Sequence, residues 1–169
     1  MAAAVTSIGP GERPMLEIGQ RAPEFTLPAD DGSEISLTTL LNRGPLLLCF
    51  LPAPLASSAA RAARALAALQ PQLQRAGLQV ACISQRPLAR YRRAHYRHPL
   101  SFPLLSDAGK DVIQMYEVAG PAGIGVRRAS FLIDCGRIIR GSARSAFRGS
   151  PHARLIRQAR ALLQSPPQA

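Results

Sequence analysis

The sequence has no apolar run long enough to cross a lipid bilayer. Its longest run, LLLCFL at residues 46–51, is far shorter than the stretch of about 20 residues that a spanning helix needs. The opening residues, MAAAVTSIGPGERPM, also lack the basic start and the apolar centre of a secretory signal peptide. We therefore expect no membrane span and a cytoplasmic location.

Cysteine is scarce, and its spacing argues against two common kinds of site. The three cysteines, Cys49, Cys82 and Cys135, lie far apart and include no CxxC pair. An odd number of cysteines in a chain without an export signal predicts reduced thiols rather than a disulfide framework. His95 and His98 have no cysteine or second histidine pair at zinc-ligand spacing, so we predict no metal site.

Phosphate-binding motifs are missing as well. The glycine-rich stretch GPAGIGV, residues 120–126, neither follows a predicted strand nor opens a predicted helix. A phosphate loop requires both of these neighbours. We predict no bound cofactor.

Negative charge is in short supply, and lysine is almost absent. There are 21 lysine and arginine residues against 10 acidic residues, which gives a net charge of +11, and Lys110 is the one lysine. The acidic residues lie within residues 12–34 and 107–117 and at Asp134. Residues 35–106 and 135–169 therefore carry only positive charge, which favours an acidic partner.

The segment ARYRRAHYRH, residues 89–98, is the densest basic stretch. Arginine can contact phosphates, and tyrosine can stack on bases, so the segment is a candidate nucleic-acid contact. The alternative is a solvated helix face whose tyrosines pack onto the sheet. The basic side chains concerned are Arg90, Arg92, Arg93 and Arg97.

The chain does contain alternating short strands and helical segments. Near the N-terminus, Pro23 and Pro28 bracket an extended segment, residues 30–32 supply a turn, and residues 34–37 alternate as an edge strand does. We expect this hairpin to lie against the first core strand, followed by a short helix that Thr38 or Thr39 caps. The remaining predicted elements are strand 46–50, helix 57–76 kinked or divided at Pro71, strand 78–84, helix 87–96, a turn after 102–106, helix 111–116, loop 120–126, strand 129–134, strand 137–141 and a closing helix from residue 150.

This order of elements predicts an α/β protein with a thioredoxin-like fold. Its central mixed sheet has helices on both faces, and a β-hairpin lies at the N-terminus. We assign residues 1–15 to a flexible lead-in, residues 16–164 to the domain and residues 165–169 to a tail.

Five stretches within residues 16–163 occur in a familiar order. They are IGQRAPEFTLPADDGSEISL, LLLCFLP, LQVACIS, FPLLSD and RRASFLIDCGRIIRG. Together they resemble the peroxiredoxins, the alkyl hydroperoxide reductase and thiol-specific antioxidant branch of the thioredoxin-like superfamily, and most closely the bacterioferritin-comigratory type. The resemblance implies an antioxidant oxidoreductase family whose members range from monomers to large rings.

Arg128 separates the branches of that superfamily. Thioredoxins carry a proline three positions before the aromatic residue of the third strand, which here is Phe131. An arginine at that position resembles the peroxiredoxins, and the resemblance implies that Arg128 holds the peroxide and lowers the pKa of the attacking thiol. A guanidinium can do so because it stabilises a nearby thiolate and does not lose its own charge.

The reactive cysteine of the family pattern is missing from this sequence. Counted onward from Pro52, the family's threonine falls on Ala56 and its peroxidatic cysteine falls on Ala59. Peroxide reduction needs a thiol that becomes a sulfenic acid, which alanine cannot supply. We predict a redoxin domain inactive as a peroxidase, with a vestigial pocket of Pro52, Ala56, Ala59 and Arg128 that serves binding or regulation. Whether the chain is an enzyme stays open.

Two alternative functions remain, and the first is an active oxidoreductase that uses another cysteine. Cys49 and Cys82 do not suit this role, because they lie in apolar strands and are expected to be small buried core residues. Cys135 instead lies in a turn between Asp134 and Gly136, so it is the candidate thiol for an active oxidoreductase with a relocated cysteine. The second alternative is a basic binding module for nucleic acid or another acidic partner. The sequence identifies neither the partner nor the oligomeric state.

Overall fold

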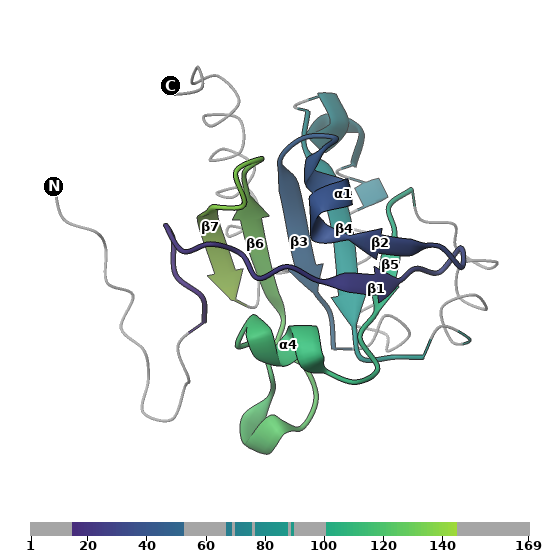
Figure 1. Cartoon of the computed structure of the whole chain (residues 1–169), viewed down its shortest axis with the longest axis vertical. Helices are drawn as coiled ribbons and strands as arrows, with labels where there is room; N and C mark the ends of the chain where they lie inside the picture. Colours follow the sequence, from purple (N-terminus) through teal and green to yellow (C-terminus); the bar gives the residue numbers. More distant parts are fainter. Residues whose placement is uncertain are drawn as a thin grey trace, which may run out of the picture.

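The computed structural model describes residues 15–52, 67–68, 70–75, 77–87, 89 and 101–144. Within these residues, a central five-stranded sheet has the strand order β5-β4-β3-β6-β7 (Figure 1). The strands are β3 (Leu46–Phe50), β4 (Gln79–Ser84), β5 (Leu104–Ser106), β6 (Ala129–Ile133) and β7 (Ile139–Arg144). β3, β4 and β5 run parallel, whereas β6 runs antiparallel to both β3 and β7. The predicted mixed sheet is confirmed.

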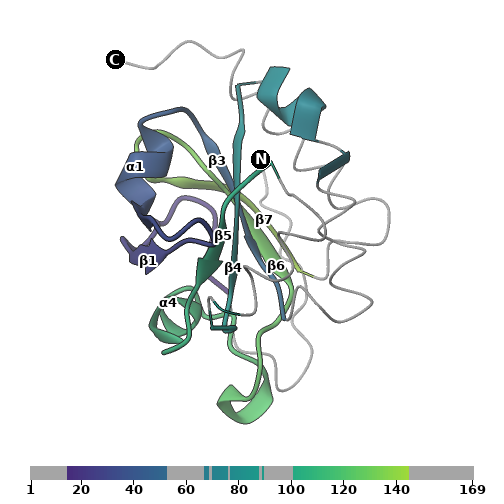
Figure 2. The ribbon, with the colours of Figure 1, turned by 90° about the vertical axis from the view of Figure 1, so that its right-hand side faces the viewer.

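The two central strands β3 and β6 form because their sequences are apolar on both faces, with the buried Ser130 of β6 as the one polar residue. Every residue of β3 and of β6 is buried, as expected for strands covered on both sides of a sheet. One face packs on α1 (Leu37–Leu41) and α4 (Asp111–Met115). The other face packs on the helical residues 70–75 through Leu73. Figure 2 shows α1 and α4 on one side of the sheet and the helical residues on the other. We call these the first face and the second face.

The N-terminal hairpin is present, as predicted, and its side chains pack on the first face of the sheet. β1 (Thr26–Pro28) and β2 (Glu34–Ser36) pair antiparallel as a separate sheet. Residues 19–30, which we call the strap, cross the first face between the two edge strands (Figure 1). The Gly19 N–H donates to the Ile139 carbonyl at 2.8 Å, and the Asp30 N–H donates to the Leu104 carbonyl at 3.0 Å. The backbone hydrogen bonds of the strap therefore go to β7 and to β5, while Phe25 and Leu27 share one core cluster with Leu48 of β3.

The local differences from the prediction have simple causes. The cap of α1 is Ser36, whose Oγ accepts the Thr39 N–H at 3.0 Å, because this hydroxyl precedes the helix and those of Thr38 and Thr39 lie inside it. From its local pattern, β5 was expected only as a lead-in to a turn, since three strand residues directly after a proline give little signal. β7 begins at Ile139, later than expected, because residues 134–137 form the turn.

Several predictions fall on residues that are outside the described ranges. They include most of the 1–15 lead-in, the early part of helix 57–76, nearly all of helix 87–96, the closing helix and the 165–169 tail. Residues 70–75 are helical and include Pro71, whereas residue 69 lies outside the described ranges, so the kink or division at Pro71 stays a prediction. A 3-10 turn at Pro121–Gly123 lies within the predicted loop 120–126. In the described ranges, no helix is long and apolar enough to cross a membrane.

Candidate functional site

One edge of the sheet collects the two described residues of the predicted pocket. β3 ends at Phe50, which pairs with Ala129 at the start of β6. Because these strands are antiparallel, the chain leaves β3 and enters β6 at the same edge. Pro52 and Arg128 therefore lie at this edge, and both are half-buried. We call it the site edge.

Alternation along β6 predicts the face on which Arg128 lies. Phe131 and Ile133 belong to the core of the first face, whereas Leu132 belongs to the core of the second face. The Ser130 hydroxyl also points to the second face, since it contacts Cys49. Successive side chains of a strand point to opposite faces, so continuing this alternation one residue before β6 predicts that Arg128 lies on the same face as Ser130.

A tight loop, residues 118–127, directly precedes Arg128. The Gly120 N–H donates to the Gly125 carbonyl at 3.1 Å, and the Arg127 N–H donates to the Val118 carbonyl at 2.8 Å. A Cβ atom at Gly120 would lie 1.9 Å from the Ile124 carbonyl oxygen. Glycine is therefore required at this position by the close approach of the two loop segments.

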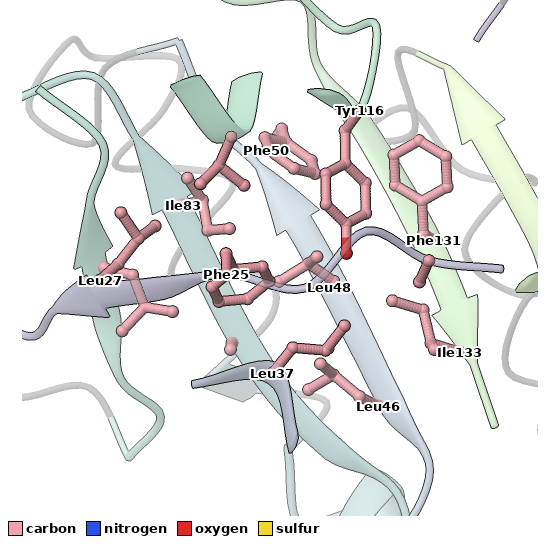
Figure 3. Packing of buried hydrophobic residues seen from close by; sticks show 14 of the residues in the cluster. Phe25, Leu27, Leu37, Leu46, Leu48, Phe50, Ile83, Tyr116, Phe131 and Ile133 are labelled. Atoms are coloured by element: carbon pink, nitrogen blue, oxygen red, sulfur yellow. The ribbon is translucent and has the colours of Figure 1, made fainter. Parts of the chain in front are cut away.

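Four aromatic rings support the site edge from the first face (Figure 3). Tyr116 lies centrally, with its ring centroid 5.2 Å from that of Phe50, 5.4 Å from that of Phe131 and 6.2 Å from that of Phe25. Its hydroxyl donates to the Pro23 carbonyl at 2.8 Å. Burial raises the pKa of Tyr116, so the hydroxyl keeps its proton and continues to donate to the strap.

The two strand cysteines are buried, as predicted, but their adjacency was not predicted. Cys49 of β3 pairs with Cys82 of β4, and the two residues are 0% and 2% exposed. The Ser130 Oγ donates to the Cys49 Sγ at 3.5 Å. A hydrogen bond with the Cys49 thiol and burial together raise the pKa of Cys82. The sequence shows two central strands with one cysteine each, but only the strand register makes the cysteines neighbours.

Cys135 is exposed, as expected for a residue in a turn. The turn is held by Asp134, whose carboxylate accepts the Ile138 N–H at 2.8 Å and the Arg140 Nε at 2.6 Å. However, Cys135 follows the far end of β6. Seven residues of extended chain separate it from Arg128, which corresponds to roughly 20 Å. The structure thus does not bring Cys135 together with the site edge.

The remaining predicted site residues are not described by the structure. Ala56 and Ala59 lie outside the described ranges, as do Arg90, Arg92, Arg93 and Arg97. The vestigial pocket and the nucleic-acid contact therefore stay predictions. Among the residues that the structure does describe, no group of three or more histidine, cysteine or acidic side chains could hold a metal ion.

An ion pair between distant segments was missed by sequence reasoning. Arg137 NH1 lies 3.1 Å from Glu24 Oε2, and Arg137 NH2 donates to the Ala22 carbonyl at 2.8 Å. Glu24 also accepts the Thr38 N–H at 3.0 Å and the Thr38 hydroxyl at 2.7 Å. Partial burial pushes the pKa of Glu24 upward, but the Thr38 hydrogen bonds and the Arg137 charge outweigh it and lower the pKa overall. We call this group the Glu24–Arg137 clamp.

Comparisons with known proteins agree with this architecture. Residues 18–142 match the profile of the AhpC/TSA family. A bcp peroxiredoxin of Coxiella burnetii is 33% identical over 125 residues, which cover 70% of this chain and 82% of that protein. Peroxiredoxin Bcp of Escherichia coli K12 is 31% identical over 125 residues, which cover 70% of this chain and 80% of that protein.

Solved structures show the same fold. Peroxidoxin BcpB of Mycobacterium tuberculosis superposes with a TM-score of 0.80 at 27% identity, covering 87% of this chain and 98% of that one. Peroxiredoxin Q of Xanthomonas campestris superposes with a TM-score of 0.75 at 16% identity, covering 83% of this chain and 92% of that one. The thioredoxin-like fold is confirmed. On the family match, the related sequences and the sheet that carries Arg128 at its edge, the chain belongs to the AhpC/TSA family of peroxiredoxins.

Proposed function

We propose that this chain is a peroxiredoxin-family domain that does not turn over peroxides at the family's usual position and instead serves binding or regulation. The proposed pocket consists of Pro52, Ala56, Ala59 and Arg128. Alanine at position 59 leaves no thiol there to become a sulfenic acid. The domain is then a pseudoenzyme.

The observation that carries this proposal is that the segment after β3 has no cysteine, although Arg128 is present where β6 begins. The sequence has no cysteine between Cys49 and Cys82, so the whole segment that follows β3 lacks a nucleophilic thiol. Arg128 nevertheless stands at the same edge, at the start of β6. An arginine placed there can hold an anionic or peroxide-like group without any thiol chemistry.

A relocated catalytic Cys135 is the competing proposal, and its exposure favours it. Against it stands the position of Cys135 at the opposite end of β6 from Arg128. A thiol in that position gains nothing from the Arg128 charge, because exposed charges beyond a Debye length of about 8 Å are largely screened. Turnover of hydrogen peroxide with a thiol donor, abolished by Cys135→Ser, would establish this alternative and remove the pseudoenzyme proposal.

The direct test restores the missing thiol with Ala59→Cys. We expect the introduced thiol to react with hydrogen peroxide at least about tenfold faster than the thiol of the matched control Ala60→Cys. The reason is that a nearby guanidinium lowers a thiol pKa by about one unit or more. The measurement is trapping of the sulfenic acid by dimedone, followed by mass spectrometry of the peptide.

A second pair of variants tests whether the faster reaction of the introduced thiol depends on Arg128. Adding Arg128→Gln to Ala59→Cys should remove the rate advantage, whereas adding Arg140→Gln, a change on an exposed residue, should leave it intact. Equal rates for Ala59→Cys and Ala60→Cys would mean that Arg128 does not serve position 59. The proposed pocket would then be wrong.

A further inference from the structure

Two thiols lie side by side in the interior of the sheet. Cys49 and Cys82 are register partners on the parallel strands β3 and β4, and both side chains belong to the core of the second face. Neighbouring strands lie about 4.8 Å apart. That spacing falls within the range of about 4.4–6.8 Å between Cα atoms that a disulfide bridges. Register and the shared face therefore make the two thiols neighbours, at a backbone spacing that a disulfide can bridge.

The two thiols differ in their hydrogen bonds. The Ser130 hydroxyl donates to the Cys49 sulfur at 3.5 Å, and a donated hydrogen bond favours the charged form of its acceptor. Cys82 instead has its pKa raised by Cys49 and by burial. We therefore assign Cys49 as the attacking thiol, because Cys49 is the one that accepts the Ser130 hydrogen bond.

We propose that Cys49 and Cys82 form a reversible dithiol–disulfide couple that small hydroperoxides oxidise, with Cys49 as the attacking thiol and Cys82 as the resolving thiol. The couple does not use position 59, so it stands apart from the proposed pocket. It makes the core of the domain a redox-sensitive element.

The chemistry balances with a hydroperoxide as the oxidant. The Cys49 thiolate attacks one oxygen of the peroxide, the O–O bond breaks, and an alcohol or water leaves with the proton. Cys49 becomes a sulfenic acid. The Cys82 sulfur then attacks the Cys49 sulfur, the S–O bond breaks, and water leaves. Two thiols lose two electrons, and one hydroperoxide is reduced.

Burial limits the rate of this reaction, and the single pair of thiols limits its stoichiometry. With exposures of 0% and 2%, the sulfurs meet an oxidant only when the second face opens locally. This restricts the oxidant to small molecules such as hydrogen peroxide. Each chain consumes one equivalent and stops until a dithiol reduces the bond again, so the couple acts once rather than by turnover.

The test uses the Cys135→Ser protein, which keeps the core intact and removes the exposed thiol. We expect hydrogen peroxide to remove both remaining thiols from the folded protein, with a mass loss of two hydrogens and a linked pair of peptides that contain Cys49 and Cys82. Dithiothreitol should restore both thiols. Because the substitution lies in an exposed turn, this variant tests the proposal even where core variants fail to fold.

Three further variants on that background test the assigned roles. Cys82→Ser should accumulate a dimedone-reactive sulfenic acid at Cys49, whereas Cys49→Ser should leave Cys82 reduced. Ser130→Ala should slow the oxidation several-fold and move its pH profile to higher pH, because the donor that stabilises the Cys49 thiolate is gone. A merely structural role of Ser130 would leave the pH profile in place.

Either of two results would overturn the proposal. One is that both thiols stay reduced when the folded protein is treated with hydrogen peroxide under conditions that oxidise them in urea, as measured by alkylation after denaturation. The other is that Cys82 is oxidised as fast in Cys49→Ser as in its parent. Neither result bears on the pocket, which is tested by the rate of the thiol introduced at position 59. Failure of one proposal is therefore distinguishable from failure of the other.

Discussion

Gly120 is the residue on which the approach to Arg128 depends. The loop from Val118 to Arg127 closes on itself through backbone hydrogen bonds, and Gly120 stands where its two segments come closest. The neighbouring atom is a backbone carbonyl oxygen of Ile124. A backbone atom cannot move aside as the end of a flexible side chain does, so any side chain at position 120 displaces the loop.

Replacing this glycine should therefore be costly. We expect Gly120→Ala to lower the free energy of unfolding by about 1–3 kcal/mol, the usual cost of an added group in a packed position. The measurement is urea-induced unfolding followed by circular dichroism. The control is Gly109→Ala, whose Cβ would meet only the end of the Asp111 side chain at 3.1 Å. Equal losses for both variants would show that the contact at Gly120 is not decisive.

At the scale of single elements, α1 (Leu37–Leu41) depends on the hydroxyl that precedes it. Ser36 accepts the Thr39 N–H and satisfies one of the amides that a helix start leaves without a partner. The helix is only five residues long, so most of its stability comes from burying its leucines on the first face. The cap determines where the helix begins.

Removing the cap should give a measurable loss. We expect Ser36→Ala to cost about 1 kcal/mol of unfolding free energy, as N-cap replacements typically do. Ser36→Thr should recover most of this loss, because it keeps a side-chain acceptor at the same position. Thermal or urea unfolding of the three proteins measures the effect. A loss in Ser36→Thr as large as that in Ser36→Ala would point to packing rather than capping.

The elements that the sequence predicted correctly are those whose signal is local. β3 is a continuous apolar run, β6 is apolar except for Ser130, and the β1–β2 hairpin has two prolines and a turn segment. β5 gives no strand signal of its own, because three residues carry too little pattern, and only the family resemblance of FPLLSD indicates a strand there. The cap of α1 was misplaced because the sequence SLTT offers three hydroxyls, and only the three-dimensional start of the helix selects among them.

The candidate site was predicted less completely than the fold, since it depends on contacts between distant segments. Pro52 and Arg128 could be paired from the family resemblance alone. By contrast, the meeting of Cys49 with Cys82 and Ser130 follows from strand register, which no local pattern records. The Glu24–Arg137 clamp joins residues more than 100 positions apart, and the sequence around either residue gives no sign of the other.

At the scale of the whole molecule, the Glu24–Arg137 clamp holds the strap, the turn before β7 and the start of α1 together. The folded state lowers the pKa of Glu24, so it favours the carboxylate. Its contribution to stability is therefore fully present above the pKa of Glu24 in the unfolded chain. As the pH falls through the lower folded-state pKa, the carboxylate is protonated and the contribution is lost.

This linkage predicts an acid-sensitive component of stability. We expect the unfolding free energy of the native sequence to fall more steeply between about pH 6 and pH 3 than that of Glu24→Gln, which has no carboxylate to protonate. Urea unfolding across this pH range measures both slopes. Glu34→Gln, a change on an exposed residue of β2, should keep the native slope. If the unfolding free energy of Glu24→Gln changes with pH as steeply as that of the native sequence, other carboxylates cause the acid sensitivity.

The contacts of the strap also determine when the domain can finish folding during synthesis. Its first residues, near Gly19, bond Ile139 of β7, and its last residues bond β5. The earliest described part of the chain must therefore wait for the latest described strand before it can dock, a contact of very long sequence separation that slows folding. Until β7 has left the ribosome, the first residues of the strap lack their partner and β6 has one unpaired edge. Exposed strand edges are the sites where chains aggregate.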